Sequence, residues 1–202
     1  MTDLVALDRI AVQESLRVLS AARDAAALAR PTPCAGWSLR RLVAHMAAQH
    51  HGFAAAARGV GADRTHWIEH DLGRDPFARY EESVRHVLAA FAEVGVTERG
   101  FDLPQIGGSF PGRVAIGFHL VDYVVHAWDV ATALGVRVDL PDVVADAALA
   151  VARRVPADPE LRGPGAAFAP AVAAPVGASP LDETLALLGR TPSRDAYDVS
   201  RP

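Results

Sequence analysis

Residues 113–134 read RVAIGFHLVDYVVHAWDVATAL, and this stretch decides the fold that we expect. Apolar residues fill most of it, and Gly135 follows as a left-handed cap that would end a helix. The stretch therefore predicts a long helix whose polar positions face into a helical bundle. Burying a carboxylate and imidazoles there would be costly unless they met a metal ion, one another or water.

Three more amphipathic helices are expected, because apolar residues recur at close to the helical period of 3.6. Their first turns carry natural caps, which are Thr2 or Asp3, Ser38, and the pair Asp75-Pro76. The expected helices span about 4–29, 39–57 and 76–94, with long connections at 59–75 and 96–112. The fold class that follows is all-α, a four-helix bundle with crossover connections.

The rest of the chain has a different character. Shorter helices are expected at about 141–155 and 180–189, and residues 156–180 are rich in Pro and Gly. We therefore expect a helical bundle over residues 1–155 and a short, partly irregular extension over residues 156–202. That extension is too short and too broken to bury a core of its own.

Composition excludes several classes of protein. The chain has 202 residues, of which 50% are hydrophobic, so it is not a disordered chain. Its formal net charge of −4 gives no basic surface for nucleic acid.

Without a signal pattern or a spanning apolar run, we expect a cytoplasmic protein that does not enter a membrane. The partners that we expect are a small-molecule substrate and a second copy of the chain in a homodimer. The single Cys excludes an internal disulfide and a Cys-based zinc site.

The chemistry concentrates in the helix expected at 113–134. His119, Asp122 and His126 are three and four residues apart, which places them on one helical face. A carboxylate four residues before an imidazole can share a metal ion with it. It can equally orient the ring through a hydrogen bond, so spacing alone leaves a metal site and a structural ion pair both open.

A metal ion would need a further ligand from another helix, and the helix at 39–57 offers His45 inside an apolar run. Two imidazoles and one carboxylate leave coordination positions open, which suits a catalytic or ligand-binding Zn²⁺ or Ni²⁺. Gln49, His119 and Asp129 are candidates to support these ligands. Cys34 is expected to be a buried small residue beneath Trp37. No residue is assigned a catalytic role.

Three segments carry a resemblance to a known family. They are Thr32-Pro-Cys-Ala-Gly-Trp-Ser-Leu-Arg-Arg-Leu-Val-Ala-His45, then Asp122-x3-His126-Ala-Trp-Asp-Val-Ala-x-Ala-Leu-Gly135, and a tail with Phe168-Ala-Pro-Ala-Val172 and Leu185-Ala-Leu-Leu-Gly-Arg-Thr-Pro192. Together they resemble the mycothiol-dependent maleylpyruvate isomerase-like metal-binding proteins of actinobacteria. That family belongs to the DinB-like four-helix superfamily.

The resemblance implies a bundle that holds a divalent metal through His45, Asp122 and His126, although some members have Glu at the position of Asp122. It also implies mycothiol as a cosubstrate, and hence a thiol-dependent transferase or isomerase acting on a small electrophile. Maleylpyruvate isomerisation itself is not expected, because residues 156–202 are too few for the isomerase's α/β C-terminal domain. The alternative is a noncatalytic metal- or ligand-binding protein, with a structural metal or a metal-free His/Asp pair.

Overall fold

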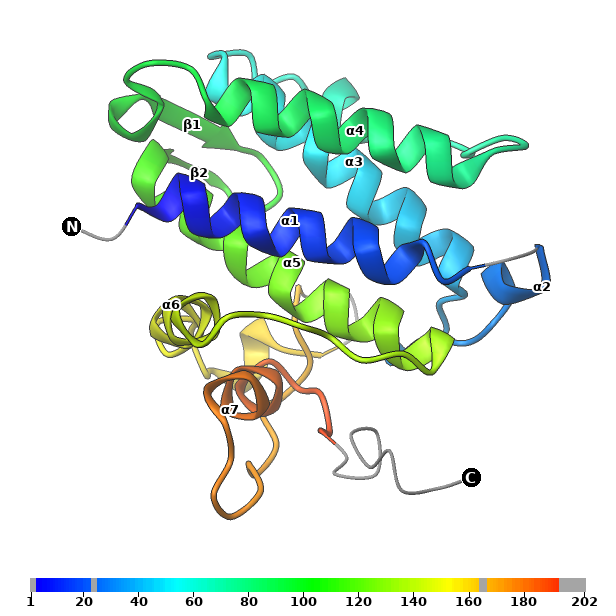
Figure 1. The fold of residues 1–202 in the computed structure, drawn as a ribbon. Coiled ribbons are helices and arrows are strands. Elements are labelled where there is room, and N and C mark those ends of the chain that lie inside the picture. The colour runs from blue at the N-terminus through cyan, green and yellow to red at the C-terminus, as the bar shows by residue number, and fades with distance from the viewer. Residues whose placement is uncertain (1–2, 23–24, 164–166, 193–202) are drawn as a thin grey trace. The chain divides into compact units, whose positions relative to one another are not determined.

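The computed structural model describes residues 3–22, 25–163 and 167–192, and it divides the chain into two compact units, Met1–Val138 and Asp139–Pro202. The first unit is a four-helix bundle built from α1 (Leu4–Leu19), α3 (Leu39–Ala57), α4 (Pro76–Phe91) and α5 (Gly112–Leu134). Within it α1 packs along α5 and α3 packs along α4, as Figure 1 shows. The predicted all-α bundle is therefore confirmed.

Local sequence explains where the bundle helices begin and end. The carboxylate of Asp3 accepts a hydrogen bond from the backbone amide of Ala6. The hydroxyl of Ser38 accepts one from the backbone amide of Arg41, so both expected caps form. Asp75 caps α4 in the same way, ahead of Pro76. Gly135 ends α5 with φ of 70°, a conformation that costs glycine least.

The first helix is shorter than the sequence predicts. Instead of one helix over residues 4–29, α1 ends at Leu19 and a single turn, α2 (Ala25–Leu28), follows. The hydroxyl of Ser20 donates a hydrogen bond to the carbonyl oxygen of Arg17 at 2.6 Å. Such a bond competes with helical pairing of the backbone at this end of α1.

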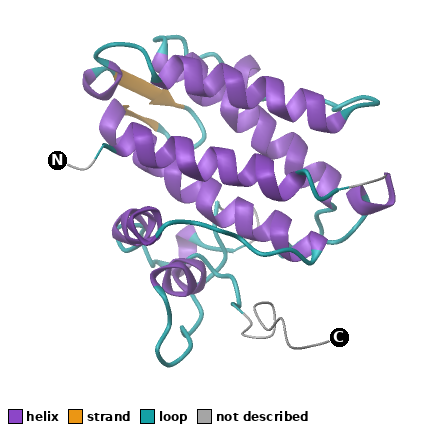
Figure 2. Ribbon diagram, viewed as in Figure 1, coloured by secondary structure: helices purple, strands orange, loops and turns teal. Residues whose placement is uncertain are grey.

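The long connections also contain structure that the sequence did not predict. A 3₁₀ turn, η1 (Arg64–Trp67), lies in the first connection, and η2 (Val96–Glu98) lies in the second. The second also forms an antiparallel hairpin of β1 (Gly100–Leu103) and β2 (Gly108–Pro111), the orange arrows of Figure 2. Phe101 of the hairpin packs in the core with Phe53, Trp67 and Phe91, and so closes one end of the bundle.

The second unit contains α6 (Asp142–Ala152), η3 (Pro159–Leu161) and α7 (Pro180–Leu187). Helices α6 and α7 pack against each other, and Ser179 with Asp182 forms a reciprocal cap at the start of α7. The expected division at residue 155 stays a prediction, and the compact units divide earlier, after Val138. Residues 193–202 of the expected extension lie outside the described residues.

Candidate metal centre

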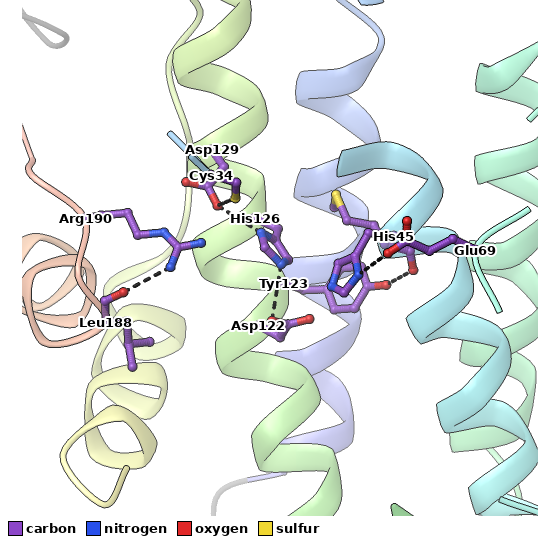
Figure 3. Close-up of polar contacts among 10 residues, drawn as sticks. Cys34, His45, Glu69, Asp122, Tyr123, His126, Asp129, Leu188 and Arg190 are labelled. Carbon is purple, nitrogen blue, oxygen red and sulfur yellow. Dashed lines mark hydrogen bonds and ion pairs between the residues drawn. The ribbon is translucent and has the colours of Figure 1, made fainter. Parts of the chain in front are cut away.

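The three predicted ligands come together between two helices. His45 lies on α3, and Asp122 and His126 lie one turn apart on α5. One donor atom from each lies within 4.8 Å of the others, and the imidazole rings of His45 and His126 are 5.5 Å apart. Figure 3 shows the side chains from the two helices converging. We call these three residues the candidate triad.

The candidate triad is neither sealed nor fully exposed. The side chain of His126 is buried, whereas those of His45 and Asp122 are each 22% exposed. A site of this kind keeps the ligands desolvated on one side and reachable on the other. That is what an open coordination position requires.

Asp129 holds His126 in place. Its Oδ2 lies 2.9 Å from Nδ1 of His126, and its side chain is fully buried. Because a carboxylate accepts, Nδ1 carries the proton and Nε2 faces Asp122, whose Oδ1 lies 3.4 Å away. Asp129, one of the candidates to support the ligands, thus contacts the ring of His126 directly.

Glu69 plays the same part for His45, and sequence reasoning missed it. Its Oε1 lies 3.1 Å from Nδ1 of His45, which leaves Nε2 of that ring as the donor atom for a ligand. This hydrogen bond lowers the pKa of Glu69, against the opposing effect of partial burial, and Arg41 adds to the lowering. Glu69 lies just after η1 in a connection whose path the sequence does not reveal, so no signal marked it.

An aromatic and basic edge borders His45. Trp37 meets the ring of His45 edge-on at 5.0 Å, and the guanidinium of Arg41 lies over the indole ring of Trp37 at 4.3 Å. Such a stack is attractive and holds the arginine in one orientation. Arg41 stays half exposed, so one positive charge stands beside the candidate triad.

Two carboxylates act on the protonation of His126. Burial lowers its pKa, but the charge of Asp122 and the hydrogen bonds with Asp129 and Cys34 outweigh that effect and raise the pKa to about 10. Without a metal ion, the ring is therefore an imidazolium at neutral pH. A cation would take the place of the Nε2 proton.

A second donor group shares His126. Cys34, on the loop before α3, donates from Sγ to Oδ2 of Asp129 at 3.2 Å, and Cys34, His126 and Asp129 also have donor atoms within 4.8 Å of one another. The expectation of a buried small residue is not met, because Cys34 is only partly buried and its thiol contacts Asp129. The Cys34 group lies on the Nδ1 side of the ring, where Asp129 already accepts the hydrogen bonds.

The candidate triad fits a divalent cation better than the Cys34 group does. Both of its imidazoles have Nδ1 tied to a carboxylate, the arrangement that orients histidine ligands in metal sites. Two nitrogen donors and one oxygen donor also match the preferences of Zn²⁺ and neighbouring transition metals.

The other two supporting candidates, His119 and Gln49, are both buried. His119 is fully buried, and its Nδ1 lies 2.7 Å from Oδ1 of Asp8 on α1. It belongs to neither of the donor groups found among the described residues. Gln49 is buried on α3, one turn beyond His45.

Comparison of the sequence with known proteins identifies a family and two relatives. A family model described as "Mycothiol maleylpyruvate isomerase N-terminal domain" matches residues 9–131, a span that contains the whole candidate triad. Two uncharacterized proteins of Mycobacterium tuberculosis, Rv0738 of strain H37Rv and MT0763 of strain CDC 1551, are each 33% identical over 180 residues. That alignment covers 89% of this chain and 93% of theirs.

Two solved structures share the bundle. Crystal structures of the mycothiol-dependent maleylpyruvate isomerase, one of them a mutant, superpose with TM-scores of 0.57 and 0.55 at 20% and 21% identity. Each match covers 74% of this chain and 66% of that chain, just under two thirds of the isomerase. At such identity the likeness shows the fold alone, a four-helix bundle. The chain belongs to the mycothiol maleylpyruvate isomerase N-terminal domain family.

Proposed function

We propose that this chain is a divalent-metal-dependent enzyme of the thiol-transferase or isomerase type, with the metal held by the candidate triad. One observation carries the proposal: His45 and His126 each have Nδ1 bonded to a carboxylate, and their donor atoms meet that of Asp122 within 4.8 Å. Two buried or half-buried imidazoles oriented in this way toward one carboxylate are typical of a metal site.

A divalent metal bound there would lower the pKa of a coordinated thiol or water and make it a nucleophile near neutral pH. The residues of the chain supply the rest. Asp129 and Glu69 fix the two rings, and the partly exposed side chains of His45 and Asp122 leave room for a small molecule to approach. Arg41, half exposed beside Trp37, is placed to attract an anionic reactant.

We propose mycothiol as the thiol and a small electrophile as its acceptor. The family's description and the titles of the solved relatives both name mycothiol, which supports this choice. Maleylpyruvate is not proposed as the substrate, since the structural match covers only 66% of the isomerase. Zn²⁺ or Ni²⁺ is the proposed metal, and the proposed setting is the cytoplasm. Among the described residues no helix is both long and apolar enough to cross a bilayer.

A noncatalytic protein is the second candidate, and one observation favours it. His126 lies between Asp122 and Asp129 at 3.4 and 2.9 Å, and its raised pKa makes it a cation. A metal-free ion pair could therefore satisfy these side chains without any ligand. Metal content and turnover together decide between the two candidates.

The test begins with metal content. Elemental analysis of the purified chain should find close to one divalent metal per chain, and His126→Ala should lose it. His70→Ala removes an exposed histidine and serves as the matched control, which should keep the metal. Equal metal content in His126→Ala and the wild type would rule out the assignment.

Activity follows as a second measurement. The chain, loaded with Zn²⁺ or stripped with a chelator, is incubated with mycothiol and a panel of small electrophiles, and conversion of the electrophile and loss of free thiol are both recorded. Metal-dependent conversion that requires mycothiol supports the enzyme, with the thiol consumed in a transfer and returned unchanged in an isomerisation. Metal binding without conversion of any electrophile would favour the noncatalytic candidate instead.

A further inference from the structure

The candidate triad spans two helices that are not the principal partners of each other. Helix α5 packs chiefly along α1, and α3 packs chiefly along α4. His45 nevertheless has to meet Asp122 and His126 across the narrower contact between α3 and α5. Ligands on two helices with few mutual contacts need a specific contact between those helices close to the ligands themselves. An error of about an ångström in the separation of the ligands would spoil coordination.

Tyr123 supplies a hydrogen bond at that level. Its hydroxyl, from α5, donates to the backbone carbonyl oxygen of Met46 on α3. Met46 follows His45 in the chain and Tyr123 follows Asp122, so the bond joins the sequence neighbours of two ligands. Tyr123 is fully buried, and a hydrogen bond shielded from water is stronger than one at the surface.

The ring of Tyr123 is itself fixed by two histidines. It stacks on His50 of α3 with centroids 4.3 Å apart and planes at 9°, and on His119 of α5 at 4.2 Å and 28°. Each histidine is anchored to another helix: Nδ1 of His50 lies 2.9 Å from Oγ of Ser83 on α4, and Nδ1 of His119 lies 2.7 Å from Oδ1 of Asp8 on α1. All four bundle helices thus meet around this one ring.

We infer that Tyr123 is a positioning residue, whose hydrogen bond to Met46 sets the separation between His45 on α3 and the two ligands on α5. The inference rests on the proposed metal site and adds to it a residue that touches no metal. It also gives His119 a role in supporting Tyr123.

The matched pair Tyr123→Phe and Tyr80→Phe tests this role. Tyr80 is also fully buried, and its hydroxyl bonds to Oγ of Ser15 at 2.6 Å, on helices that carry none of the candidate triad. Each change deletes one buried hydroxyl and keeps the ring, so both variants lose thermal stability. Only Tyr123→Phe should weaken Zn²⁺ binding, by about tenfold, the lower end of what loss of a supporting contact costs a metal site.

Affinity is measured by calorimetric titration of the metal-free chain with Zn²⁺, at a temperature where all three proteins are folded. The visible spectrum of the Co²⁺-loaded chain gives a second readout, and it should change for Tyr123→Phe but not for Tyr80→Phe. Equal Zn²⁺ affinity in Tyr123→Phe and wild type overturns the inference and leaves the metal site standing. Equal weakening in both variants overturns it as well, because it would show a general loss of stability.

A wild type that binds no Zn²⁺ overturns the metal site and this inference together. If Tyr123→Phe does not fold, a crystal structure of the Zn²⁺-loaded wild type decides. A hydroxyl of Tyr123 within about 3.5 Å of the Met46 carbonyl oxygen supports the inference. A longer separation with the metal bound overturns it.

Discussion

Asp129 accepts a hydrogen bond from Nδ1 of His126, three residues earlier on α5, with the two atoms 2.9 Å apart. This hydrogen bond fixes the orientation of the His126 ring, so that Nε2 of the same ring points toward Asp122. Glu69 does the same for His45 from a connection far along the chain. Both contacts lead to tests that do not depend on knowing a substrate.

Replacing Asp129 by Asn keeps the size of the side chain and removes its charge. The ring of His126 then loses its charged partner, so we expect Zn²⁺ affinity to fall by about 10–100-fold, the usual cost of changing such a residue. Calorimetric titration measures it. Asp146→Asn, at an exposed position of α6, is the matched control. Unchanged affinity in Asp129→Asn would show that the contact does not orient a ligand.

Glu69→Gln should act in the same direction but less strongly. Its side chain is 38% exposed and its hydrogen bond with His45 is longer, so solvent already shares the contact. We expect a loss of about tenfold or less in Zn²⁺ affinity. Glu81→Gln, at a partly exposed position of α4 where the carboxylate pairs with Arg85, provides the control. A larger loss than that of Asp129→Asn would contradict the view that the buried carboxylate is the stronger support.

The metal-free chain should lose stability as the pH rises. The pKa of His126 in the folded chain is about 10, above the value of about 6.5 for an unfolded histidine. The contribution of the His126 imidazolium to the free energy of unfolding is therefore fully present below pH ~6.5. It disappears as the pH rises through ~10. Urea unfolding in chelator at pH 6.5 and 9.5 should show a decrease in the free energy of unfolding.

Asp122→Asn is the comparison for that experiment, because the charge of Asp122 is the largest influence that raises this pKa. The variant should show a smaller decrease between the two pH values than the wild type. Identical pH dependence in both proteins would mean that Asp122 does not stabilise the imidazolium.

Gly52→Ala tests how the connection that carries Glu69 is held. A Cβ at Gly52 would lie 2.2 Å from the indole ring of Trp67, whose Nε1 donates to the carbonyl oxygen of Gly61. The displaced indole should cost about 1–3 kcal/mol of stability, more than the helix gains from alanine. Thermal unfolding measures it, with Gly100→Ala, where only a flexible Ser109 hydroxyl lies near, as the control. A midpoint at or above that of wild type would contradict the close contact.

Most of the bundle could be read from helical periodicity and caps, because each of those signals is local. Asp3, Ser38 and Asp75 all cap helices as expected. The hairpin could not, since its strands have only four residues each, too few for their alternating burial to stand out in the sequence. The break after α1 has no such local signal, since a bond of the kind that the Ser20 hydroxyl makes to Arg17 is also made by Ser15 in the middle of the same helix.

Contacts within one helix could be predicted from their spacing, whereas His45, on another helix, was expected beside them because it lies in an apolar run and because the family resemblance implies it. Asp122, His126 and Asp129 lie within two turns of α5, and their spacing predicts their contacts. His119 lies on the same stripe, but seven residues correspond to about 10.5 Å along a helix, so it meets Asp8 instead of His126. Glu69, Cys34 and the Tyr123–Met46 bond depend on tertiary packing, which no spacing in the sequence encodes.

The single ring of His126 serves both donor groups, with Nε2 toward Asp122 and Nδ1 toward Asp129 and Cys34. Two cations on the two groups would have to share that ring as an imidazolate, stripped of both protons. A cation on either group therefore makes the other group a poorer site, because the same imidazole would have to give up its second proton to hold both.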